Sequence, residues 1–267
     1  MSGHLDRLSR VYSHETWDVY ELLDQRTEPR GRDWLHELAA EYLAPGVRIL
    51  DAGCRDAADL IRLVRKHDGS GVGVDPVAVH VDRAREAVVS AELAGRIEIV
   101  HGVMETLSYP DGCFDFVWCR DVLVQVEPLD QALTELARLL KTDGRILIYT
   151  TYATDLLSAD ERSLLERHLG NVPANLVERH VEEAFGRARL RVERKDVIGS
   201  EFKEYAEERT QPGSRTLLRL ARLSRLRERL IREQPADLLG HIEANLHWEL
   251  FGYLGKLRPT VYILAQG

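Results

Sequence analysis

Short apolar runs alternate with longer amphipathic segments over the first 150 residues of the chain. Each run has the length of a buried strand, and the segments between the runs place apolar residues at helical spacing. Strands are expected at 47–50, 71–74, 97–100, 114–118 and 145–149, with helices at 33–43, 56–64, 79–93 and 129–140. Such alternation predicts a parallel sheet that is covered by helices on both faces.

The alternation becomes irregular after residue 152. Helices are expected at 160–168, 174–186, 215–232 and 237–254, and two further strands fit at 190–197 and 260–265. The fold class is therefore expected to be α/β, with a doubly wound, mostly parallel sheet of seven strands. The long helical insertion between the last two strands, residues 199–256, is expected to lie as a cap over one end of the sheet.

Composition and charge narrow the functional classes. The chain has 267 residues, of which 44% are hydrophobic and 30% charged, as in folded globular proteins. Its net charge of −8 argues against nucleic acid or an anionic membrane as the main partner. We expect a cytoplasmic protein, because the first ten residues lack a signal-peptide core and no apolar run approaches ~18 residues.

The cysteines and histidines do not suggest a metal site. The three cysteines, Cys54, Cys113 and Cys119, lack the spacing of zinc ligands, and their odd number argues against a disulfide framework. The ten histidines show no pair at metal-binding spacing with a carboxylate. No metal is therefore expected, and the thiols are expected to be reduced.

Acidic and glycine-containing motifs follow three of the expected strands. Parallel α/β sheets bind ligands beyond the carboxyl ends of their strands. Asp51-Ala-Gly-Cys-Arg-Asp56 follows the first strand, Asp75-Pro76 the second and Gly102-Val-Met-Glu105 the third. Asp75 lies 24 positions after Asp51, close to the ~20 expected for an acid that binds ribose hydroxyls. This pattern predicts a nucleoside-containing cofactor.

The loop after the first strand argues against a phosphate-bearing cofactor. A dinucleotide site needs G-x-G-x-x-G, but here only Gly53 fits, with Arg55 and Ala58 at the other two positions. The Walker sequence of ATP-binding loops is absent. S-adenosylmethionine has no phosphate, so an arginine at position 55 in place of the second glycine would hinder its binding less than that of a dinucleotide.

Four motifs in order carry a family resemblance. They are Val47-Arg-Ile-Leu-Asp-Ala-Gly-Cys54, Gly73-Val-Asp75, Tyr109-Pro-Asp-Gly-Cys-Phe-Asp-Phe-Val-Trp118 and Leu139-Leu-Lys-Thr-Asp-Gly144. This series resembles the class I S-adenosylmethionine-dependent methyltransferases, and most closely the branch that methylates quinones, sterols and bacterial natural products. The resemblance implies a Rossmann-like methyltransferase fold and methyl transfer to a small molecule, such as a secondary metabolite.

The resemblance also implies roles for individual residues. Asp51, Gly53 and Cys54 would surround the methionine part of the cofactor, and Asp75 would accept the ribose hydroxyls. Val103 stands where many relatives carry an aspartate, so adenine recognition is expected from Glu105, a backbone group or water. The implied cofactor-binding residues are Tyr12, Asp51, Gly53, Cys54, Arg55, Asp75, Pro76, Met104, Glu105, Cys119 and Arg120.

The resemblance completes the expected organisation of the chain. Residues 1–30 would form helices that close over the cofactor, with Tyr12 or Tyr20 near it. Residues 31–198 would form the S-adenosylmethionine-binding core, residues 199–256 the cap over the acceptor, and residues 257–267 the last strand. Two alternatives stay open: a nicotinamide-dependent oxidoreductase, and a non-catalytic protein of the same fold that binds S-adenosylmethionine.

Methyl transfer requires positioning more than chemical assistance. The reaction is an in-line displacement, and a base is needed only if the acceptor must lose a proton. Asp121 follows the fourth strand and is a candidate base or amine anchor, or alternatively a helix cap or a partner of Arg120.

The last expected helix carries a second candidate group. His241, Asn245 and Trp248 fall on one stripe of that helix and suggest a pocket for a ring-bearing acceptor, with His241 as a second catalytic candidate. A packed helix face with a hydrogen-bonded histidine explains the stripe equally well.

An arginine-rich helix has two interpretations. Six arginines between Arg215 and Arg232 fall within an arc of about 140° at 100° per residue. They could face an anionic acceptor or form a solvated surface. A homodimer is a further possibility that the sequence leaves open.

Overall fold

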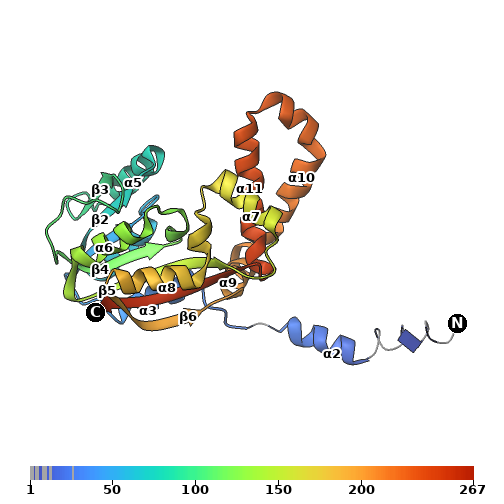
Figure 1. Cartoon of the computed structure of the whole chain (residues 1–267), viewed down its shortest axis with the longest axis horizontal. Helices are drawn as coiled ribbons and strands as arrows, with labels where there is room; N and C mark the ends of the chain where they lie inside the picture. The colour runs from blue at the N-terminus through green and yellow to red at the C-terminus, as the bar shows by residue number, and fades with distance from the viewer. Residues whose placement is uncertain (1–2, 4–5, 8–10, 12–13, 26) are drawn as a thin grey trace.

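Seven strands form a single mixed sheet. The computed structural model describes residues 1–267 except 1–2, 4–5, 8–10, 12–13 and 26. The strands are β1 (Arg48–Ala52), β2 (Ser70–Asp75), β3 (Ile97–His101), β4 (Phe114–Arg120), β5 (Leu140–Ala153), β6 (Leu190–Val197) and β7 (Leu257–Gln266). Their spatial order is β3-β2-β1-β4-β5-β7-β6, and β7 runs antiparallel to both of its neighbours (Figure 1). The expected fold class is confirmed.

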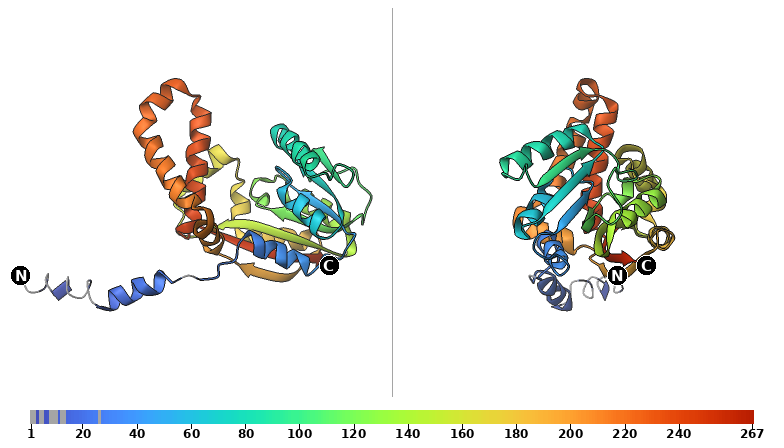
Figure 2. Two further views of the ribbon diagram at one scale, coloured as in Figure 1. Left: turned by 180° about the vertical axis from the view of Figure 1, so that it is seen from behind. Right: turned by 90° about the vertical axis from the view of Figure 1, so that its left-hand side faces the viewer.

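Helices cover both faces of this sheet. The helical elements are α2 (His14–Leu23), α3 (Arg32–Ala40), α4 (Ala58–Lys66), α5 (Ala78–Ser90), η1 (Leu123–Gln125), α6 (Leu129–Leu139), α7 (Ala159–Leu169), η2 (Pro173–Leu176), α8 (Glu178–Arg187), α9 (Glu201–Thr210), α10 (Pro212–Glu233) and α11 (Ala236–Tyr253). The apolar sides of α3, α4 and α5 pack on one face of the sheet, and those of α6 and α8 pack on the other (Figure 2).

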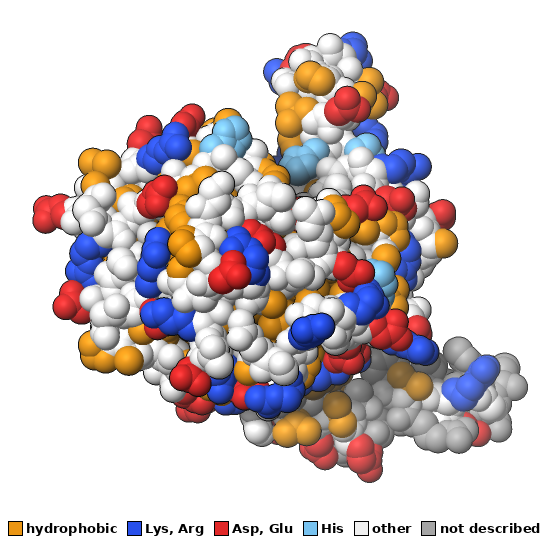
Figure 3. All heavy atoms as spheres, turned by 60° about the vertical axis from the view of Figure 1, so that its left-hand side comes forward, with side chains coloured by type: hydrophobic (Ala, Val, Ile, Leu, Met, Phe, Trp, Pro, Cys, Tyr) orange, Lys and Arg blue, Asp and Glu red, His pale blue; other side chains and the backbone are white. Residues whose placement is uncertain are grey.

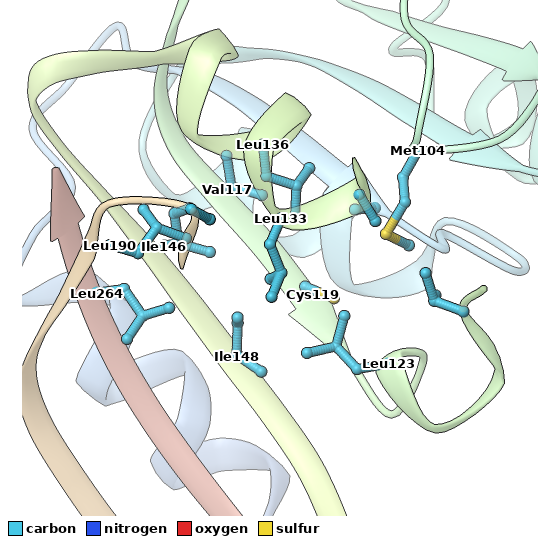
Figure 4. Close-up of a cluster of buried hydrophobic side chains, with 14 of the residues drawn as sticks. Met104, Val117, Cys119, Leu123, Leu133, Leu136, Ile146, Ile148, Leu190 and Leu264 are labelled. Carbon is cyan, nitrogen blue, oxygen red and sulfur yellow. The ribbon is translucent and has the colours of Figure 1, made fainter. Parts of the chain in front are cut away.

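The two packed faces explain why the strands read as continuous apolar runs. In β4, Phe116 and Trp118 belong to the core beneath α3 and α4, whereas Val117 and Cys119 belong to the core beneath α6. A strand that is buried on both faces needs apolar residues at successive positions. Figure 4 shows the second core, in which Cys119 lies among Leu123, Leu133 and Ile148.

A helical hairpin stands beside the sheet. Helices α10 and α11 lie between β6 and β7 in sequence and rise from the body as an arm, defined here as residues 212–253 (Figures 1 and 2). Helix α7 packs against α11, where the ring of His168 contacts Gly240. The insertion thus forms a separate wall beside the sheet, and its predicted role as a cap over the acceptor stays a prediction.

Most predicted elements match the structure, but the helix expected at 174–186 is divided at Val177 into η2 and α8, and η1 was not predicted. Helix α9 was not predicted, because its sequence is polar and none of its residues is buried. Helix α2 lies in the predicted N-terminal segment, but Figures 1 and 2 show it extending away from the sheet. Its Trp17 and Tyr20 are 61% and 56% exposed. Closure of this segment over the cofactor stays a prediction. Among the described residues, no helix is long and apolar enough to cross a membrane.

Candidate cofactor and acceptor site

The predicted cofactor residues converge on one cleft. The cleft has a volume of about 490 Å³ and lies where β1, β2 and β4 end. Most of the predicted residues line it: Asp51, Gly53, Cys54, Arg55, Asp75, Pro76, Met104, Glu105, Arg120 and Asp121. The parallel strands bring these separate segments together because their carboxyl ends meet at the same edge of the sheet.

The loop after β1 is shaped by a glycine in the left-handed region. Gly53 has a φ of +84°, and a Cβ atom at this position would lie 2.4 Å from Cγ2 of Val122. A side chain at position 53 would therefore clash with the loop after β4 as well as strain the backbone. The amides of Gly53 and Cys54 both donate to the carbonyl of Val74, at 2.9 and 3.0 Å. These bonds fix the loop against the end of β2.

Asp75 is held in place at the end of β2. Its carboxylate accepts hydrogen bonds from the amides of Arg55 and Val77, at 3.0 and 2.9 Å, and lies 3.1 Å from Nδ1 of His80. Only 5% of the residue is exposed. A carboxylate has about four acceptor sites, so these contacts leave capacity for ribose hydroxyls.

The acidic groups under the cleft favour a ligand with positive charge. Asp51 is 3% exposed, and burial together with the charge of Asp59 raises its pKa well above the usual range, while Arg120 opposes the shift. Asp75 adds to the negative charge. A cation bound nearby would favour the ionised form of Asp51. The ammonium and sulfonium groups of S-adenosylmethionine fit this requirement.

Asp59 connects the cleft to α3 through a buried ionic cluster. Its carboxylate lies 2.7 Å from Nε of Arg120, 2.7 Å from Arg32 and 2.9 Å from Nε2 of His36. Burial alone raises the pKa of Asp59, but the bonds from these three partners outweigh it and hold the pKa below its usual range. The ring of His36 is fully buried and stacks on Trp118, with centroids 4.9 Å apart. The cluster therefore fixes Arg120 from beneath.

Arg120 keeps part of its guanidinium available. Its Nε atom contacts Asp59, while its side chain is 30% exposed and lines the cleft. The planar guanidinium has five donors, so its terminal N–H groups can bind a carboxylate while Nε stays on Asp59.

Asp121 is an exposed residue in the lining of the cleft. It has a φ of +61°, a strained value for a residue with a side chain, and such residues cluster at functional sites. Thr151 donates to its carboxylate at 3.4 Å. Desolvation by the many protein atoms around it raises the pKa of Asp121, although the side chain still reaches solvent. The charges of Lys203 and Arg120 oppose this shift, and Glu249 adds to it. Asp121 therefore faces charges from both α9 and α11.

Four predicted residues do not line the cleft. Cys119 is fully buried in the core on the opposite side of β4, because adjacent strand residues point to opposite faces (Figure 4). His241 contacts the carbonyl of His168 at 3.0 Å, Asn245 lines a groove between α10 and α11, and Trp248 packs against a small apolar cluster that includes α7. Helix α11 thus turns this stripe toward its neighbouring helices. Tyr12 lies outside the described residues.

The sequence reasoning missed several groups around the cleft. Asp59 and Trp118 line it, and Lys203 bonds to Glu249 at 2.6 Å near Asp121. Asp59 on the apolar side of α4 was a usable signal, because a carboxylate among leucines requires a partner. No comparable signal marked Lys203, since its helix was not predicted. No group of three or more acidic, histidine or cysteine side chains within the described part of the chain is placed to hold a metal ion.

The order of the strands separates two families that bind nucleoside cofactors. Dinucleotide-binding sheets have the order 3-2-1-4-5-6, whereas here an antiparallel β7 is inserted between β5 and β6. Residues 50–148 match the family model described as a methyltransferase domain. Residues 50–148 thus form a methyltransferase domain of the class I S-adenosylmethionine-dependent type. The predicted family and its methyl donor, S-adenosylmethionine, are therefore confirmed.

Related methyltransferases act on different kinds of small molecule. Sterol 24-C-methyltransferase erg-4 of Neurospora crassa is 28% identical over 53% of this chain and 39% of its own length. The mitochondrial ubiquinone biosynthesis O-methyltransferase of Schizosaccharomyces pombe is 34% identical over 54% of this chain and 51% of its own. The chain thus spans about two fifths of the first relative's length and one half of the second's.

A solved methyltransferase shows the same fold. Geranyl diphosphate C-methyltransferase of Streptomyces coelicolor superposes with a TM-score of 0.65, covering 88% of this chain and 79% of its own, at 15% identity. That similarity supports the methyltransferase fold and leaves the acceptor open.

Proposed function

We propose that this methyltransferase transfers a methyl group from S-adenosylmethionine to a small organic acceptor that binds beside Asp121. The observation that carries this proposal is the convergence of Asp51, Asp75 and Arg120 on one cleft, at the end of a sheet with the methyltransferase strand order. The cleft offers carboxylates for a cationic ligand with hydroxyl groups and a guanidinium for its carboxylate.

The lining residues suggest how the cofactor is held. Asp75 would accept the ribose hydroxyls, and Met104 and Glu105 would lie beside the adenine. Asp51 would face the positively charged methionine part. The free side of the Arg120 guanidinium would bind the methionine carboxylate, because it is the cationic side chain that Asp59 fixes in the cleft.

The protein contributes mainly by positioning and by accepting a proton. S-adenosylmethionine supplies an electrophilic methyl carbon on sulfur, and its transfer leaves S-adenosylhomocysteine. Asp121 would accept the proton from an acceptor hydroxyl or amine, or anchor an amine, and its raised pKa makes its carboxylate a stronger base. Lys203 and Glu249 would border the acceptor on the side of the arm.

The class of acceptor is proposed only as far as the relatives support it. Sterol and ubiquinone-pathway enzymes among them point to a small organic molecule. A ring-bearing secondary metabolite remains our hypothesis for this chain. His241, Asn245 and Trp248 do not line the cleft, so they could contact such a molecule only if it extended beyond the cleft.

Two measurements test this proposal. Calorimetry should detect binding of S-adenosylhomocysteine and no comparable binding of NADH, and the reverse result would favour the oxidoreductase. Methyl-labelled S-adenosylmethionine is then incubated with a panel of phenols, carboxylic acids and amines, and transfer is followed by mass spectrometry. Tight binding without transfer to any panel member, or to extracts of the source cells, would favour the non-catalytic alternative.

A further inference from the structure

The arm carries an open groove along the line where α10 and α11 meet. The groove has a volume of about 480 Å³. Its lining includes Leu223, Leu226 and Leu230 from α10 and Ile242 from α11, together with Arg219 and Arg222. Leu226 is 41% exposed and Ile242 is 38% exposed. Helix packing within the arm therefore leaves this groove unfilled.

The exposed apolar lining calls for an occupant. The three leucines of α10 have the i, i+3 and i+7 spacing of a helix face that packs against another surface. Helix α11 covers only part of that face, and Figure 3 shows hydrophobic side chains open to solvent on the arm. Apolar surface in a concave site, bordered by polar groups, is typical of ligand binding.

Two arginines give the groove a positive charge. Arg219 and Arg222 lie three positions apart and form no hydrogen bond or ion pair with any residue that the structure describes. On the same helix, Arg227 pairs with Glu243 and Arg229 with Glu233. No acidic side chain is found among the described residues that line the groove. Guanidinium groups without an acidic partner can bind a carboxylate or a phosphate.

The dimensions of the groove set the size of its ligand. Leu223 and Leu230 are seven residues apart, which corresponds to roughly 10 Å along a helix. An extended chain advances about 1.2 Å per bond, so roughly nine bonds span this distance. A chain of medium length therefore matches the apolar part of the groove.

We propose that the α10–α11 groove binds an amphipathic anion. Its apolar chain lies along the leucines of α10, and its carboxylate or phosphate lies between Arg219 and Arg222. The site is separate from the cofactor cleft, since the two share no lining residue. One short segment lies near both, because His241 of the groove contacts the carbonyl of His168 and Gly170 lines the cleft. Binding here does not depend on methyl transfer.

Decyl compounds test the proposal directly, below their micelle-forming concentrations. Decanoate, decyl phosphate and decanol are titrated into the full chain, and binding is followed by calorimetry. Both anions should bind more tightly than decanol. The double variant Arg219→Gln/Arg222→Gln should weaken binding of the anions by about tenfold and barely change binding of decanol. The reason is that each exposed charge pair accounts for up to roughly fivefold in affinity. The tighter of the two anions identifies the head group as phosphate or carboxylate.

A matched variant controls for net charge. Arg225 and Arg232 also lack partners among the described residues, but they do not line the groove. The double variant Arg225→Gln/Arg232→Gln should keep anion binding within about twofold of the original chain. Leu226→Ser should weaken all three ligands, and circular dichroism shows whether each variant folds.

Three results would overturn the proposal. They are the absence of binding by either anion, an equal loss in the two double variants, and a dimer in light scattering that Leu226→Ser dissociates and that excludes the anions. Binding of S-adenosylhomocysteine is measured on every variant. Its persistence when anion binding is lost separates this proposal from the proposed methyl transfer.

Discussion

Removing the charge of Asp59 should weaken recognition of the cofactor's carboxylate without removing the cleft. Asp59→Asn keeps the shape of the side chain but loses the ion pair that holds Arg120 at 2.7 Å. Charge-assisted hydrogen bonds contribute ~1.5–3 kcal/mol, which corresponds to roughly a tenfold to 100-fold change in affinity. We expect a loss at the lower end of this range, because Arg120 itself remains.

Paired ligands isolate the contribution of the carboxylate. S-adenosylmethionine and its decarboxylated form share the adenosine, the sulfonium and the amine, and differ only in the carboxylate. Calorimetry should show that Asp59→Asn weakens binding of S-adenosylmethionine about tenfold and binding of the decarboxylated form by less than about threefold. The ratio of these two losses in affinity, expressed as a free energy, gives a coupling energy of ~1 kcal/mol between the ligand's carboxylate and the charge at position 59.

A second variant separates positioning from stability. Breaking a buried ion pair costs ~3–5 kcal/mol, so Asp59→Asn should also lower the melting temperature. Arg32→Gln removes another partner of Asp59, but Arg32 is 43% exposed in its side chain and does not line the cleft. This variant should lose some stability and keep the preference for the carboxylate. Equal loss of both ligands in Asp59→Asn would refute the role assigned to Arg120.

Three other predictions concern single carboxylates. Because the folded-state pKa of Asp59 lies below its ordinary value, its ionised form contributes stability that is complete above about pH 4 and is lost as the pH falls further. Asp59→Asn should therefore unfold at higher pH than the original chain, and the difference in stability between the two should shrink below about pH 4; a difference that stays constant as the pH falls would contradict this. Asp75→Ala should weaken S-adenosylhomocysteine by ~2–4 kcal/mol in calorimetry, and an unchanged affinity would exclude Asp75 from the ribose site. Once an acceptor is found, Asp121→Asn should reduce kcat by ~10²–10⁴ if Asp121 is the base, whereas a change confined to KM would assign it to anchoring.

The core of the fold was accessible from sequence because its signals are local. Each strand of the parallel part is a short apolar run, and the motifs at Asp51, Asp75 and Glu105 follow directly from strand ends. The parallel arrangement then places these motifs at one edge of the sheet without further information. Most residues that line this part of the cleft could therefore be predicted, although Asp59 and Trp118 were missed and Cys119 lies outside the lining.

The side of the cleft where we propose that the acceptor binds depends on contacts between distant segments. Asp121 was recognised because it follows β4, but Lys203 comes from a helix with no apolar face, and Glu249 lies one residue beyond the stripe that drew attention to α11. Periodicity gives the spacing of residues on a helix and not the direction in which each face points. Helix α11 turns that stripe toward α7 and α10, and only the tertiary packing decides this.

The position of β7 has a consequence for how the chain is made. Within the sheet, β6 pairs only with β7, and β7 joins it to β5. Until residues 257–266 leave the ribosome, β5 has an open edge and β6 has no strand to pair with. Open strand edges are prone to association with other chains. Premature termination within the arm should therefore yield aggregating fragments, even though most of the cofactor cleft has already been synthesised.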